Sequence, residues 1–251
     1  MDIYSGFADV YDSLMDNVPY REWTERIISR LKENGIEDGL VLDLGCGTGT
    51  VCELLSEAGY DMIGVDASAD MLRLANEKKI AGGHDILYLL QDMRSFELYG
   101  TVRAVICICD SLNYLLEEEE LLECFRLVNN YLDPGGLFLF DFNTVHKYRD
   151  VIGETVIAEK REECSFIWEN SYEDGINDCE LTVFMKAEDG RYDCMEEEHL
   201  QRGYEPAQIR AALDQAGMIF VGAEDSESGG EPDETSERIF VTAREKGKKA
   251  S

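Results

Sequence analysis

Short apolar runs alternate with helical patterns from residue 40 to residue 142, and this alternation constrains the fold more than any other feature of the chain. The apolar runs lie at 40–44, 62–65, 86–90, 102–109 and 137–142, the last after an Asp133-Pro134-Gly135-Gly136 turn. Helical patterns lie between them at 50–58, 69–79 and 117–132. Such alternation predicts a parallel sheet whose strands are joined by right-handed crossovers. Because the runs are continuously apolar, we expect both faces of the sheet to be buried.

The segments on either side of this pattern complete the predicted architecture. Residues 3–34 carry two amphipathic helical stripes, and Pro19 suits the first turn of the second helix. Four strand patterns separated by turn signals follow within residues 148–203, at 152–159, 164–172, 178–187 and 191–202. A helix at 205–216 and strands at 218–223 and 238–243 then resume the first pattern.

These patterns predict a Rossmann-like α/β fold with a doubly wound, mostly parallel seven-stranded sheet and a small antiparallel β insert. We expect residues 1–147 to form the N-terminal helices and most of the α/β core. Residues 148–203 are expected to form the insert, and residues 204–251 to complete the core.

The charge of the chain argues against several kinds of partner. It carries 53 acidic and 23 basic residues, a formal net charge of −30. Such a field repels phosphate groups, so we expect neither a nucleic-acid partner nor an anionic membrane partner. No run approaches the roughly 20 apolar residues of a membrane-spanning helix. The segment Met1-Asp2-Ile3-Tyr4-Ser5 lacks the features of a signal peptide, which favours a cytoplasmic protein.

Cysteine and histidine usage argues against a metal centre. The chain has three histidines, and its cysteines include no pair of Cys-x₂-Cys motifs, so we expect no metal site. Several of the cysteines lie in apolar runs, where a thiol packs as a small hydrophobic group. We expect reduced thiols at positions 46, 52, 107, 109, 124, 164, 179 and 194.

The strongest functional signal is the segment Val41-Leu42-Asp43-Leu44-Gly45-Cys46-Gly47-Thr48-Gly49. A predicted strand leads there into a glycine-rich turn that a helix follows, and glycines allow a tight backbone to approach a ligand. Dinucleotide-binding turns have the spacing Gly-x-Gly-x-x-Gly, which places a helix N-terminus at a pyrophosphate. Here the spacing is Gly-x-Gly-x-Gly with Thr50 after it. S-adenosylmethionine (SAM) has no pyrophosphate, and this turn suits its amino-acid portion better.

Polar residues follow the next three predicted strands as well. Asp66 ends the second strand, where a carboxylate can accept hydrogen bonds from both ribose hydroxyls. Asp92 and Met93 follow the third, where a carboxylate and a backbone amide could bind an adenine edge. The segment Cys109-Asp110-Ser111-Leu112-Asn113-Tyr114 follows the fourth. Open α/β sheets bind ligands at this end of their strands, so we expect these groups to share one cleft.

These motifs, with the Asp133-Pro134-Gly135-Gly136 turn and the N-terminal segment Phe7-Ala8-Asp9-Val10-Tyr11-Asp12, resemble the class I SAM-dependent methyltransferases. The resemblance implies SAM as cofactor, contacted by Gly45, Asp66, Asp92 and Met93. It also implies that the N-terminal helices form a lid, with Tyr11, Tyr20 and Arg21 facing the cofactor or substrate. Asp43 would either brace the glycine turn or bind the SAM ammonium group. The predicted cofactor-binding residues are Tyr20, Asp43, Gly45, Cys46, Gly47, Asp66, Ala67, Met71, Asp92, Met93, Cys109 and Asp110.

The expected reaction is an in-line displacement by an acceptor atom on the sulfonium methyl group, with rate arising mainly from proximity and water exclusion. A base is needed only if the acceptor arrives protonated, and Tyr11, Asp110 and His199 are candidates. We predict catalytic roles for Tyr11 and His199, with core packing and a structural histidine as the respective alternatives. The predicted acceptor is a small molecule with an N or O nucleophile. A SAM-binding regulatory module without turnover and an NAD(P)-dependent oxidoreductase remain alternatives, and the chain is expected to be a monomer or homodimer.

Overall fold

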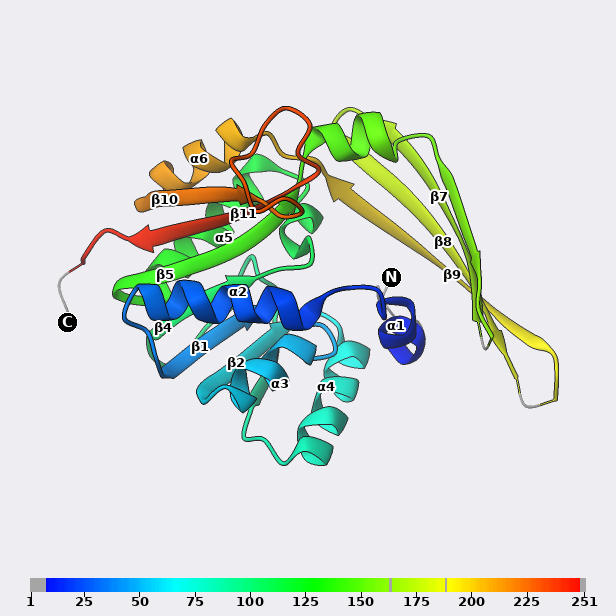
Figure 1. Cartoon of the computed structure of the whole chain (residues 1–251), viewed down its shortest axis with the longest axis horizontal. Coiled ribbons are helices and arrows are strands. Elements are labelled where there is room, and N and C mark those ends of the chain that lie inside the picture. The colour runs from blue at the N-terminus through cyan, green and yellow to red at the C-terminus, as the bar shows by residue number, and fades with distance from the viewer. Residues whose placement is uncertain (1–7, 163, 188, 249–251) are drawn as a thin grey trace.

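The computed structural model describes residues 8–162, 164–187 and 189–248, and it contains two sheets (Figure 1). The large sheet has seven strands in the order β10-β11-β5-β4-β1-β2-β3. Its strands are β1 (Gly39–Leu44), β2 (Tyr60–Asp66), β3 (Leu87–Leu90), β4 (Val102–Cys107), β5 (Leu132–Asn143), β10 (Met218–Asp225) and β11 (Arg238–Glu245). Strand β11 runs antiparallel to both of its neighbours, while β1 to β5 pair in parallel. The predicted mostly parallel seven-stranded sheet is confirmed.

Helices cover both faces of this sheet. They are α2 (Tyr20–Glu33), α3 (Thr50–Glu57), α4 (Ala69–Gly82), α5 (Glu118–Tyr131) and α6 (Pro206–Gln215). In β5, Phe138 and Phe140 pack into the core on the α5 and α6 side, whereas Leu137 and Leu139 pack on the α2 and α3 side. Because neighbouring side chains of a strand point to opposite faces, burial of both faces requires a continuously apolar strand. The expectation drawn from the apolar runs is confirmed for β5, but it is wrong for the edge strand β3, where Leu87 and Leu90 are exposed.

The second sheet is the predicted antiparallel insert, with strands in the order β6-β7-β8-β9. These strands are β6 (Val156–Lys160), β7 (Cys164–Glu173), β8 (Ile176–Lys186) and β9 (Tyr192–Arg202). Helix α1 (Ala8–Leu14) lies between the insert and α4, where Val10 packs with Met71 of α4 and Leu181 of β8 (Figure 1). The insert and α1 together therefore face the carboxyl ends of the core strands.

Local details differ from the sequence-based prediction in three places. The first insert strand does not begin at residue 152, because the chain forms η2 (Lys147–Val151), a π-helical segment, before β6 begins at Val156. The 133–136 turn lies inside β5, where the pairing with β4 skips from Leu132 to Leu137. Strand β4 ends at Cys107 instead of 109, because Cys109 and Asp110 have positive φ angles.

Several predictions fall wholly or partly outside the described residues. The structure does not describe Phe7 of the N-terminal motif, the segment 1–5 or residues 249–251. The division of the chain at residues 147 and 203 also stays a prediction.

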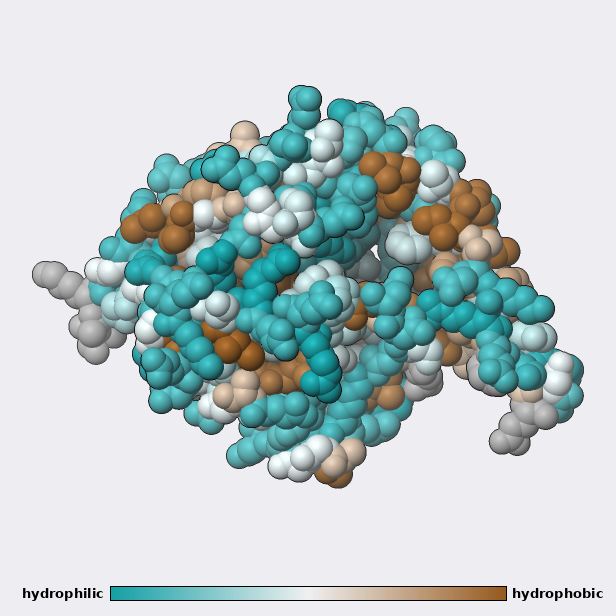
Figure 2. All heavy atoms as spheres, viewed as in Figure 1, coloured by the Kyte–Doolittle hydropathy of each residue, from teal (hydrophilic) through white to brown (hydrophobic). Residues whose placement is uncertain are grey.

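The surface is predominantly polar. Figure 2 shows hydrophilic side chains over most of the visible face of the core, in keeping with the net charge of −30. No helix in the described part of the chain has the length and apolar content needed to cross a membrane.

Candidate active site

A cavity of about 300 Å³ lies at the carboxyl ends of β1, β2 and β4. Ligand sites in open α/β sheets occupy this edge, and pockets of this size hold small molecules. The glycine turn and Asp66 line its core side, whereas Tyr11 of α1 and Trp168 and Leu181 of the insert line the opposite side. The cavity is therefore bounded by the core, the N-terminal helix and the insert.

The glycine turn is held against β2 by its backbone. Gly45 N and Cys46 N both donate hydrogen bonds to Val65 O, at 2.8 and 3.0 Å, and Gly47 N donates to Asp66 Oδ2 at 2.8 Å. A Cβ at Gly45 would lie 2.7 Å from Ser111 Oγ, so a side chain there has no room. At Gly47, which has a φ of 53°, a Cβ would meet nothing within 4 Å. Any side chain at position 47 would therefore project into open space beside the cavity.

The Asp66 carboxylate is oriented by backbone donors on both oxygens. Oδ2 accepts from Gly47 N and Oδ1 accepts from Ser68 N, both at 2.8 Å. Each oxygen retains a second accepting position, as two neighbouring hydroxyl groups require. Burial raises the pKa of Asp66, and the backbone donors partly offset this effect. The side chain lines the cavity.

Asp43 lies deeper, at the end of β1, and is 2% exposed. Cys52 Sγ donates a hydrogen bond to its Oδ2 at 3.2 Å. Burial raises the pKa of Asp43 to about 7, because the carboxylate is removed from water. Its ionised form would be stabilised by a cation in the cavity that it lines.

Asp43→Asn is expected to change the pH dependence of stability without ligand. The folded-state pKa of Asp43 lies above the unfolded value of about 3.9, so the native state binds the proton more tightly. Asp43 therefore makes the free energy of unfolding decrease as pH rises from about 4 to 7, by at most about 4 kcal/mol. Urea unfolding of Asp43→Asn should show a shallower decrease across this window. Parallel pH profiles of variant and wild type would contradict the assignment.

A polar clamp holds α1 over the glycine turn. Thr48 Oγ1 donates to Asp12 Oδ1 at 2.7 Å, and Lys78 Nζ forms an ion pair with Asp12 Oδ2 at 2.7 Å. From the other side, the Arg161 guanidinium donates to Ser13 O and forms an ion pair with Asp16 Oδ1 at 3.1 Å. Helix α1 is thus tied to both the core and the insert.

Two of the three residues expected to face inward from the N-terminal helices do so. Tyr11 and Tyr20 line the cavity and are hydrogen-bonded to each other. Arg21 is exposed on α2 and lies outside the lining, so this expectation is wrong. Because α2 packs on the core through Thr24, Ile27 and Leu31, position 21 falls on its solvent side.

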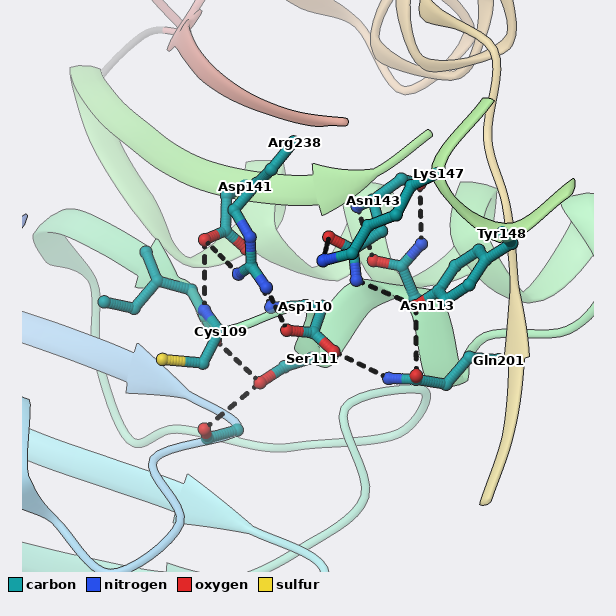
Figure 3. Close-up of polar contacts among 12 residues, drawn as sticks. Cys109, Asp110, Ser111, Asn113, Asp141, Asn143, Lys147, Tyr148, Gln201 and Arg238 are labelled. Atoms are coloured by element: carbon teal, nitrogen blue, oxygen red, sulfur yellow. Dashed lines mark hydrogen bonds and ion pairs between the residues drawn. The ribbon is translucent and has the colours of Figure 1, made fainter. Parts of the chain in front are cut away.

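The polar end of the cavity is organised around a buried guanidinium group (Figure 3). Arg238 forms ion pairs with Asp110 Oδ1 at 2.6 Å and with Asp141 Oδ2 at 3.0 Å. Asp141 also accepts hydrogen bonds from the backbone N–H groups of Cys109 and Asp110, at 3.2 and 2.8 Å. These contacts hold both residues at φ angles of 60° and 53°, which non-glycine residues seldom adopt. Gln201 of the insert donates to Asp110 Oδ2 at 2.8 Å.

His199 and Tyr114 form a second polar group in the lining. His199 Nδ1 lies 3.2 Å from Tyr114 Oη, and His199 Nε2 lies 3.6 Å from Glu197 Oε2. Burial lowers the pKa of His199, so the imidazole is neutral at pH 7. A neutral imidazole between a hydroxyl and a carboxylate can accept a proton on the hydroxyl side while the carboxylate stabilises its charged form.

The cavity brings together most of the predicted site residues. They are Tyr11, Tyr20, Asp43, Gly45, Cys46, Gly47, Asp66, Met71, Cys109, Asp110 and His199. Three others lie outside the lining. Ala67 is exposed, and Asp92 forms an ion pair with the Arg94 guanidinium at 2.6 Å. The Met93 side chain lies next to Gly45, with Cε 3.5 Å from the position of a Cβ at that glycine. Their contacts with a nucleotide stay predictions.

Sequence reasoning missed Asp141, Lys147 and Arg238, all of which belong to this end of the site. Asp141 carried a signal, since an acidic residue inside the apolar run Phe138-Leu139-Phe140-Asp141-Phe142 needs a buried partner. Nothing in the sequence distinguishes Lys147 and Arg238 from ordinary charged surface residues. In the described residues, no cluster of three or more His, Cys, Asp or Glu side chains is arranged to hold a metal ion.

Comparison with known proteins agrees with this geometry. Residues 41–136 match a family model described as a methyltransferase domain. Over 244 residues the chain is 35% identical to YqeM of Bacillus subtilis, named as a methyltransferase, covering 96% of this chain and 97% of the relative. The crystal structure of a SAM-dependent methyltransferase from Clostridium acetobutylicum superposes with a TM-score of 0.89 at 30% identity, covering 97% and 99% of the two chains. The chain belongs to the SAM-dependent methyltransferases.

A further relative of this methyltransferase matches in part. It is the dTDP-3-amino-3,4,6-trideoxy-alpha-D-glucopyranose N,N-dimethyltransferase of Streptomyces venezuelae, 31% identical over 136 residues. The match covers 53% of this chain and 56% of the relative.

The residues of the methyltransferase site fit SAM, its cofactor. The open space at Gly47 leaves room for a ligand against the turn, and Asp66 offers two oriented acceptors to a ribose. Asp43 offers a buried carboxylate in the same cavity to a cationic group.

Proposed function

We propose that this methyltransferase transfers a methyl group from SAM to an amino nitrogen or hydroxyl oxygen of a small molecule. The observation that carries this proposal is the cavity of about 300 Å³ bounded by α1 and the insert, each tied to its neighbours by hydrogen bonds and ion pairs. A cavity of this volume holds a small molecule whole, whereas of a macromolecule it could take only one extruded side chain or base. The net charge of −30 also disfavours nucleic acid, and the partial relative from Streptomyces venezuelae is named for transfer to an amino sugar.

Different residues of the cavity would bind different parts of the cofactor. Asp66 would bind the ribose, while the glycine turn would lie against the methionine portion and Asp43 would bind its amino group. The bound cofactor supplies an electrophilic methyl group on a sulfonium. Helix α1, held by Asp12, would exclude water and fix the two reactants relative to each other.

Tyr114 and His199 would remove a proton from the acceptor. The Tyr114 hydroxyl lines the cavity and can pass a proton to His199 Nδ1, while Glu197 lies beside Nε2 to stabilise the imidazolium. Tyr11 lines the same cavity on the lid side and stays a candidate for contact with the acceptor.

His199→Asn is expected to lower kcat by about 10²- to 10⁴-fold with little change in SAM affinity, because a positioned base contributes rate and no cofactor contact. In the wild type, kcat/KM should fall at acid pH as the imidazole becomes protonated, with an apparent pKa below the usual 6.5. That acid limb should disappear in the variant. Tyr114→Phe should reproduce the loss of kcat. Wild-type kcat in His199→Asn would contradict this role.

The acceptor class can be tested with SAM labelled by tritium in its methyl group. Purified protein is incubated with a bacterial extract separated into small metabolites, protein and nucleic acid. We expect label in the metabolite fraction only. Label in protein or nucleic acid would overturn the proposal, and tight SAM binding without label in any fraction would favour a regulatory module.

We propose a cytoplasmic location. All eight cysteines are free thiols, and most of them are buried. Free thiols of this number are typical of a reducing compartment.

A further inference from the structure

Among the described residues that line the cavity, two carry cationic side chains, Arg238 and Lys147. Arg238 is committed to two carboxylates, those of Asp110 and Asp141. The Lys147 ammonium donates one hydrogen bond, to Asn143 Oδ1 at 3.1 Å, and has no ion-pair partner in the described part of the chain. An ammonium has three N–H donors, so two of them remain available toward the cavity.

Acidic groups near Lys147 do not neutralise it directly. Asp110 and Asp141 lie in its surroundings but pair with Arg238, and Glu237 is exposed. Burial and the nearby Arg238 guanidinium lower the pKa of Lys147. A cation held in such a place without a counterion is unfavourable, and a bound anion would relieve it.

Hydrogen bonds hold Asn143, the residue that contacts Lys147, in a defined position. Asn143 exchanges two hydrogen bonds with Asn113, each at 2.9 Å, and donates from Nδ2 to Tyr148 Oη at 2.9 Å (Figure 3). Lys147 begins the π-helical segment η2, which connects β5 to the insert. Such segments are rare and occur frequently at functional sites.

A second donor in the same cavity lacks an acceptor. Trp168 of β7 lines the cavity, and its buried Nε1–H has no hydrogen-bond partner among the described residues. Leaving a buried N–H unsatisfied costs about 1–3 kcal/mol. The Nε1 atom is covered by neighbouring atoms, so it is Lys147, and not Trp168, that offers available donors to a ligand in the cavity.

We propose that Lys147 binds an anionic oxygen group, a carboxylate or a phosphate, on the methyl acceptor. This assignment rests on the proposed transfer to a small molecule and narrows it to acidic acceptors. The apolar side chains of Phe166 and Leu181 would pack against the body of the acceptor, and the Lys147 ammonium would fix its charged end. Lys147 is then a specificity-determining residue, because a neutral analogue leaves the half-buried ammonium unpaired.

Anion binding can be measured without knowing the acceptor. The protein, labelled with ¹³C in its methionine methyl groups and saturated with S-adenosylhomocysteine, is titrated with acetate, inorganic phosphate and acetamide at constant ionic strength. Met15 lines the cavity and serves as the reporter. We expect acetate or phosphate, but not acetamide, to shift the Met15 signal in a saturable manner. Lys147→Met should weaken that binding at least tenfold, and Lys147→Arg should retain it within about threefold.

The outcomes separate this assignment from the proposed function. Anion binding that is equal in wild type and Lys147→Met, equal responses to acetate and acetamide, or no response to either anion would overturn it. A tenfold loss of S-adenosylhomocysteine affinity in Lys147→Met would also overturn it, because Lys147 would then bind the cofactor. Tritium transfer into protein or nucleic acid contradicts the proposed function but leaves the anion titration unaffected. Comparison of the acetate and phosphate titrations identifies which of the two anions the site binds more tightly.

Discussion

Asp66→Ala is expected to weaken SAM binding by roughly 1.5–3 kcal/mol, about 10- to 150-fold in Kd. The carboxylate is the candidate acceptor for both ribose hydroxyls, and it also fixes the glycine turn through Gly47 N. Its loss therefore removes ligand hydrogen bonds and loosens the turn that borders the cavity. Isothermal titration calorimetry with SAM measures the change directly.

Asp61→Ala provides a matched control for this experiment. Asp61 lies on the same strand, β2, but its side chain is exposed at the opposite end. The control should keep wild-type affinity. Urea unfolding of Asp66→Ala must accompany the titration, because Asp66 also accepts from Ser68 N at the start of α4. A folded Asp66→Ala variant with unchanged SAM affinity would contradict the assignment of the Asp66 carboxylate to the ribose hydroxyls.

Arg238→Met is expected to lower the free energy of unfolding by roughly 3–5 kcal/mol, because the two carboxylates that share this guanidinium would lose their counterion. Asp141 is 3% exposed and cannot recover its hydration. Cys109 and Asp110 would also lose part of the support for their positive φ angles, because Asp141 binds their backbone. Denaturant unfolding at pH 7 measures the loss.

A matched surface variant gives an independent check. Arg126→Met, which removes an exposed pair with Glu123, should change stability by less than about 1 kcal/mol at any pH. A loss below about 1 kcal/mol in Arg238→Met would show that the pair of carboxylates does not depend on this arginine.

The sheet and the cofactor side of the site could be predicted because their signals are local. Continuously apolar strands required two covered faces, and parallel strands place their carboxyl ends at one edge. The glycine turn, Asp66 and Asp110 each follow a strand directly, so strand order alone brought them into one cavity.

On the acceptor side, Asp110 and His199 were predicted, but the contacts that organise them were not, because these contacts join distant parts of the chain. Arg238 reaches Asp110 across 128 residues, and Gln201 reaches it across 91. These contacts require β11 to pair beside β5 and the insert to fold back over the core, and hydrophobic periodicity specifies neither event. The π-helical turn at Lys147 has no distinctive pattern, so the sequence predicted the insert but not its connection to the core.

The position of the cofactor is the claim on which the other assignments depend. A crystal structure with S-adenosylhomocysteine tests it most directly. We predict the ribose hydroxyls on the Asp66 carboxylate, the homocysteine portion against the 45–47 turn, and the sulfur facing the part of the cavity lined by Tyr114, Lys147 and His199. A ribose bound away from Asp66, or a sulfur facing away from those three side chains, would contradict the account.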